Sequence, residues 1–67
     1  MFDLEKFNAM LCRHHTSKRD VSKYLGISIA SLYRRLQKGG EFTTTEIRLL
    51  INFYGKEEVL DCLFSCD

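Results

Sequence analysis

The stretch that decides the fold is Ser17 to Gln37, SKRDVSKYLGISIASLYRRLQ. The hydroxyl of Ser17 can cap a helix, and the carboxylate of Asp20, three residues later, can return the hydrogen bond, which makes a capping box. Gly26 stands where a left-handed residue often ends a helix. Ser28 can then cap a second helix. The stretch therefore predicts two short helices joined by a tight bend that contains glycine.

The apolar residues of both halves recur at helical spacing. They are Val21, Tyr24 and Leu25, followed by Leu32 and Leu36. The spacing predicts helices over Lys18–Leu25 and Ile29–Lys38, with the two later leucines forming the inward ridge of the second helix. Two short helices joined by a bend containing glycine form a helix-turn-helix.

This motif resembles the Cro/repressor, or XRE-like, helix-turn-helix family of phage and bacterial transcription regulators. The family has glycine at the bend, as at Gly26, and apolar residues at the inward positions, as at Leu32 and Leu36. The runs L-G-I-S and S-L-Y-R-R-L-Q-K-G look like family members in detail. Two positions depart from the pattern: Lys18, where many members carry Gln, and Ser22, where Ala is commoner. Neither departure breaks the geometry.

Composition favours one globular, all-α domain over residues 1–67. Apolar residues make up 45% of the chain and charged residues 28%, which is ordinary for a folded protein. The chain has no proline and no apolar run long enough to cross a membrane, and we expect no signal peptide. The resemblance implies a compact five-helix bundle of the lambda-repressor-like DNA-binding type.

Three further helices are expected, over Asp3–Cys12, Thr44–Tyr54 and Glu57–Ser65. The clearest helix start is at Thr43, which can form a capping box with Glu46. The apolar stripes of the five helices predict a common core. Its expected members are Leu4, Phe7, Leu11, Val21, Leu25, Leu32, Leu36, Ile47, Leu50, Ile51 and Leu60.

The charge distribution says more than the net charge of +1. Seven of the ten basic residues lie between Arg13 and Lys38, together with a single acid, Asp20, whereas six of the nine acids follow Lys38. Positive charge therefore gathers on the predicted helix-turn-helix. A basic motif on a nearly neutral chain fits a polyanionic partner at one face.

The resemblance implies that the outward face of the second motif helix contacts DNA bases. The positions that match are Ser28, Ile29, Ala30, Tyr33, Arg34 and Gln37. Arg34 can bond guanine O6 and N7, Gln37 can do the same for adenine, and Ile29 and Ala30 can pack on thymine methyl groups.

Phosphate contacts are expected around both ends of the motif. The residues assigned to them are Ser17, Lys18, Arg19, Lys23, Lys38 and Gly39. The threonines at 43–45 could add another contact, which Glu41 and Glu46 would oppose.

Cysteine usage indicates reduced thiols and no metal. Cys62 and Cys66 are four residues apart on one expected helix, which is poor disulfide geometry. Cys12 with His14 and His15 fits no zinc spacing, and no C-x-x-C is present. We expect no metal, cofactor or small-molecule ligand, and no enzymatic activity, because no catalytic set accompanies these residues.

The motif and its charge predict sequence-specific binding to a double-stranded DNA operator, and the resemblance implies a small phage- or prophage-type transcriptional regulator, a Cro-like protein or repressor. Its expected location is the cytoplasm, at the bacterial nucleoid or in a phage-infected cell. We expect a homodimer through the last helix and Leu49/Phe53, although these residues could instead complete the core of a monomer. The alternative is a protein-interaction module, such as the antitoxin of a toxin–antitoxin pair.

Overall fold

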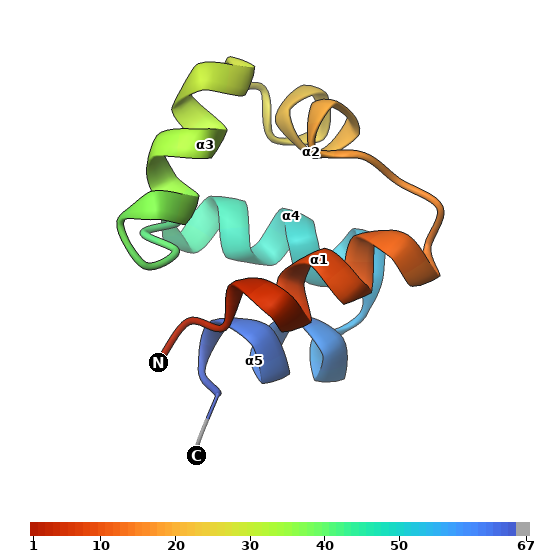
Figure 1. Cartoon of the computed structure of the whole chain (residues 1–67). Helices are drawn as coiled ribbons and strands as arrows, with labels where there is room; N and C mark the ends of the chain where they lie inside the picture. The colour runs from red at the N-terminus through yellow and green to blue at the C-terminus, as the bar shows by residue number, and fades with distance from the viewer. Residues whose placement is uncertain (66–67) are drawn as a thin grey trace.

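A computed structural model of the chain describes residues 1–65, and this part contains five α-helices and no β-strand (Figure 1). The helices are α1 (Leu4–Arg13), α2 (Lys18–Leu25), α3 (Ile29–Gln37), α4 (Thr44–Tyr54) and α5 (Lys56–Leu63). The all-α prediction is confirmed, and every predicted helix end lies within two residues of the observed one. None of the helices in the described part is long and apolar enough to cross a membrane.

The predicted caps are present at the helix starts. The hydroxyl of Ser17 accepts a hydrogen bond from the backbone N–H of Asp20 at 3.2 Å, and the Asp20 carboxylate accepts one from the N–H of Ser17 at 2.8 Å. The backbone N–H of Ser17 and, to a smaller extent, its hydroxyl donate hydrogen bonds to the Asp20 carboxylate. These bonds favour the charged form and lower the pKa of Asp20 below its ordinary value. Thr43 and Glu46 form the second capping box, at α4.

The core lies where all five helices meet. α4 crosses the middle of the molecule, α5 packs against α1 and α4, and α2 packs against α3 and α4 (Figure 1). The buried apolar residues are Phe7, Met10, Leu11, Val21, Leu25, Leu32, Leu36, Leu50, Tyr54, Val59, Cys62 and Leu63. Ile47, Ile51 and Leu60, which were also expected in the core, are only half-buried. The prediction for Leu4 was wrong: its side chain is 43% exposed, because it begins α1 at the edge of the core.

The link between α2 and α3 is a three-residue bend, Gly26 to Ser28. Gly26 has a φ of 73°, in the left-handed region that glycine adopts without strain, and the N–H of Ile27 donates to the carbonyl of Ser22 at 3.0 Å. Ser22 is buried, and its hydroxyl donates to the carbonyl of Arg19 at 2.7 Å. A serine is therefore tolerated at this packed position, because its polar atom is satisfied within its own helix.

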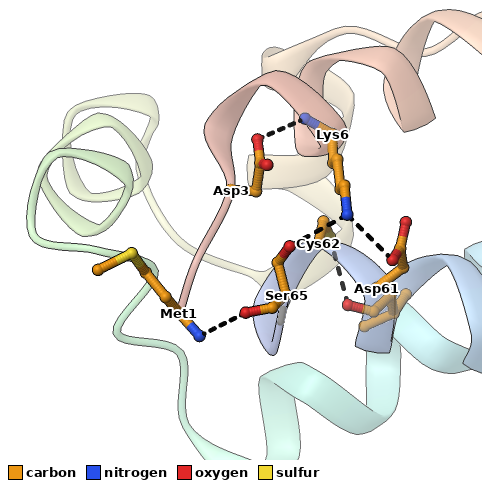
Figure 2. Close-up of polar contacts among 7 residues, drawn as sticks. Met1, Asp3, Lys6, Asp61, Cys62 and Ser65 are labelled. Atoms are coloured by element: carbon orange, nitrogen blue, oxygen red, sulfur yellow. Dashed lines mark hydrogen bonds and ion pairs between the residues drawn. The ribbon is translucent and has the colours of Figure 1, made fainter. Parts of the chain in front are cut away.

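The first residues of the chain pair with the end of α5, as Figure 2 shows in part. The N–H of Asp3 donates to the carbonyl of Cys62 at 2.7 Å, and the N–H of Ser65 donates to the carbonyl of Met1 at 2.9 Å. Lys6 adds side-chain bonds to Asp61 at 3.3 Å and to the hydroxyl of Ser65 at 3.0 Å (Figure 2). This segment holds α1 and α5 together.

Candidate nucleic-acid interface

The outward face of α3 carries all six residues that the sequence assigned to base contacts. Every one of them is exposed, whereas Leu32 and Leu36 on the opposite face are buried. The six residues are Ser28, Ile29, Ala30, Tyr33, Arg34 and Gln37. The hydroxyl of Ser28 is already engaged as the cap of α3, accepting from the N–H of Ser31 at 3.1 Å. Within the described residues, no hydrogen bond or ion pair engages the other five side chains.

These exposed residues fall into two rows along α3. Ala30, Arg34 and Gln37 follow the i, i+4, i+7 spacing that places side chains on one line of a helix. Ile29 and Tyr33 form a second row, four residues apart, and both line a surface cleft beside α2. One row thus faces outward, and the other forms a wall of the cleft.

The cleft has a volume of about 790 Å³ and is open to solvent. Its α3 wall is Ile29 and Tyr33, its second wall is the start of α2 with Lys18 and Arg19, and its third is α1, including Asn8 and Cys12. Ser17 also lines it. Three of the six predicted phosphate-contacting residues therefore lie at one place, next to the exposed face of α3.

The remaining predicted phosphate contacts lie elsewhere. Lys23 is exposed in the last turn of α2, and Lys38 and Gly39 are exposed just after α3. Within residues 1–65, none of the cations Lys18, Arg19, Lys23, Arg34 and Lys38 forms an ion pair with a carboxylate. Their charge is therefore available to an anionic partner.

An ion pair that sequence reasoning missed joins α3 to the start of α4. The guanidinium of Arg35 donates to Glu46, whose carboxylate also accepts the N–H of Thr43 at 2.9 Å. Glu46 is only 7% exposed. From the sequence, this carboxylate was expected to oppose a phosphate near residues 43–45, but the guanidinium of Arg35 balances its charge. The signal available in the sequence was that Arg35 lies beside the inward ridge of its helix.

The two residues named for a homodimer differ in their surroundings. Leu49 is half-buried and packs against the core, so part of its apolar surface is already covered within the monomer. Phe53 is 44% exposed and lies with its ring centroid 4.6 Å from that of Tyr24, which is 37% exposed. On the last helix, Phe64 at its C-terminal end is 58% exposed.

The cysteines and histidines of the described part lie in different surroundings. Cys12 is exposed and Cys62 is buried, both as free thiols, and Cys66 lies outside the described residues. Burial raises the pKa of Cys62 to about 11, so little thiolate exists there at neutral pH. His14 lies 2.7 Å from a carboxylate oxygen of Glu58 on α5. No group of three potential metal ligands occurs within residues 1–65.

Comparisons with protein-family models, with curated proteins and with solved structures gave no match to this chain.

Proposed function

We propose that this protein binds double-stranded DNA sequence-specifically through a helix-turn-helix formed by α2 and α3, in a domain of the lambda-repressor-like type. The observation that carries the proposal is the exposed face of α3, with Arg34 and Gln37 in one row. Lys18 and Arg19 lie in the cleft beside its first turns and Lys38 follows its last turn, and within residues 1–65 none of these three is in an ion pair. An α-helix fits the major groove of B-form DNA, where side chains can reach base edges.

In this arrangement the two ends of the motif anchor the backbone while α3 reads the groove. Lys18 and Arg19 at the start of α2, and Lys38 after α3, supply phosphate contacts that set the register. Arg34 offers a bidentate pair of donors to a guanine, and Gln37 offers a donor and an acceptor to an adenine. Ala30, in the same outer row, packs on the methyl group of a thymine. Occupation of an operator would exclude polymerase and so repress a gene, as in a small Cro-like regulator.

Arg34→Ala is expected to weaken binding to the preferred site by about 1–3 kcal/mol and to relax the preference at one base pair. Lys18→Ala should instead weaken binding to all duplexes similarly and reduce the salt slope of the binding constant by about one. The preferred site is first obtained by selection from random duplexes. Both variants are then titrated against that site and a random duplex across a salt series.

Equal losses on both duplexes for Arg34→Ala would mean that this residue only holds the backbone. Wild-type binding that shows no preference for any duplex, and no effect of either substitution, would contradict the proposal. A protein-interaction role, such as that of an antitoxin, would then take its place.

A dimer is part of the proposed mechanism, because one recognition helix reads only a few base pairs. Two copies would bind half-sites one DNA turn apart, at about 34 Å.

We expect a weak homodimer through α5 and the Leu49/Phe53 side of α4. Sedimentation of the protein alone and on its operator measures this. Phe64→Ser should lower the dimer fraction without changing monomer stability, since the Phe64 side chain is mostly exposed. A monomer in both conditions would contradict the dimer.

A further inference from the structure

The α1 wall of the cleft carries a polar side chain, Asn8, outside the predicted DNA contacts. Asn8 is exposed on α1 and lines the same cleft as Lys18 from α2 and Tyr33 from α3. These three residues come from three different helices and offer an amide, an ammonium group and a phenol hydroxyl. Each of these groups is a hydrogen-bond donor.

We propose that this cleft seats the sugar–phosphate backbone of one DNA strand, with Asn8 and Tyr33 donating hydrogen bonds to phosphate oxygens next to Lys18. The proposal rests on the proposed DNA-binding function and deepens it in two ways. It gives α1 a direct part in DNA binding. It also assigns Tyr33 to the DNA backbone, whereas the resemblance implied that Tyr33 contacts a base.

The charges around the cleft favour an anionic occupant. Lys18 and Arg19 line it, and no carboxylate does so within the described residues. Asp20 is the nearest acid along the chain, and its carboxylate is held by the N–H of Ser17 at 2.8 Å and by the Ser17 hydroxyl at 3.1 Å. That bonding directs the acid into the cap of α2. Neutral donors such as the Asn amide and the Tyr hydroxyl commonly contact phosphate oxygens beside cations.

The position of Tyr33 separates it from the residues that read bases. Arg34 and Gln37 lie in the outer row of α3, whereas Tyr33 and Ile29 form the wall of the cleft. A strand seated in the cleft would run along this second row and leave the outer row facing the groove beside that strand. Tyr33 would then meet the backbone at the edge of the groove.

Asn8→Ala and Tyr33→Phe test the proposal on the full chain, with the selected site and a random duplex as probes. Each is expected to weaken binding to both duplexes by about tenfold to a hundredfold, as the loss of a hydrogen bond to a charged group does. Neither should change the salt slope, because a neutral donor releases no counterion, whereas Lys18→Ala should lower it. Asn52→Ala is the matched control, since Asn52 is an exposed asparagine on α4 that does not line the cleft.

A second measurement locates the contact. Replacing one phosphate of the site at a time by an uncharged methylphosphonate should reveal a position where wild-type binding falls and Asn8→Ala causes no additional loss. Asn8→Ala that binds like Asn52→Ala, or Tyr33→Phe that changes the preference at one base pair, would overturn the inference while leaving the DNA-binding function intact. Wild-type protein that binds no duplex would overturn both.

Discussion

Replacing Leu32 by alanine is expected to lower the free energy of unfolding by about 3 kcal/mol, which is typical of a leucine truncated in a packed core. The Leu32 side chain is completely buried and belongs to the inward ridge of α3. Its removal leaves a cavity between α3 and the rest of the core. A domain of this size has a stability of only about 3–10 kcal/mol in total, so this loss is a large fraction of the stability of the protein.

Urea unfolding followed by circular dichroism measures the loss. Ile29→Ala is the matched control on the same helix, because Ile29 is 36% exposed and should contribute much less to stability. Leu32→Met, which nearly conserves volume, should cost less than about 1.5 kcal/mol and keeps the comparison measurable if the alanine variant does not fold. An unchanged urea midpoint for Leu32→Ala would show that α3 is not fixed to the core in this way.

The features that were predictable from sequence depend on residues that are close together along the chain. Capping boxes and bend glycines act over three or four positions, so Ser17 with Asp20, Thr43 with Glu46, and Gly26 each mark a helix end directly. Helical periodicity likewise separates the inward Leu32 from the outward Arg34 on α3. The outward face of α3 was predictable for the same reason.

The features that were not predictable depend on how separate helices meet. The pairing of Met1 with Ser65 and the ion pair of Arg35 with Glu46 join residues that no local pattern relates. The cleft could not be predicted for the same reason, because Asn8 and Tyr33 line one cavity only after α1 and α3 have packed in the folded protein. Periodicity also fails at helix ends, where Leu4 continues an apolar stripe beyond the edge of the core.

The loop after α3 shows how such distant contacts constrain a residue. Gly40 has a φ of 73°, and a Cβ atom there would lie 2.5 Å from the ring of Phe2. The ring of Phe2 in turn lies 5.8 Å from that of Phe7 in the core, measured between centroids. Glycine is thus needed at this position both for its backbone and for the space that Phe2 occupies, and only the second reason depends on the tertiary fold.

The contact between Arg35 and Glu46 leads to the second large effect. Glu46→Ala removes the acceptor of both the Arg35 guanidinium and the N–H of Thr43, and it leaves a half-buried cation without a partner. We expect the free energy of unfolding to fall by about 2–4 kcal/mol, less than for a fully buried pair because Arg35 can turn toward water. Glu46→Gln should cost less, since an amide oxygen can still accept both hydrogen bonds.

The same change should also affect the proposed DNA-binding face, because Arg35 belongs to α3 and Glu46 to α4. Glu46→Ala should therefore weaken binding to the preferred site under conditions where the variant is fully folded, since α3 loses its fixed orientation against α4. Glu41→Ala, which removes an exposed acid from the neighbouring loop, is the control for charge alone. A double-mutant cycle with Arg35→Ala completes the measurement. If the two substitutions add without any coupling energy, the ion pair does not hold α3 in place, and the orientation of the helix must come from its buried leucines alone.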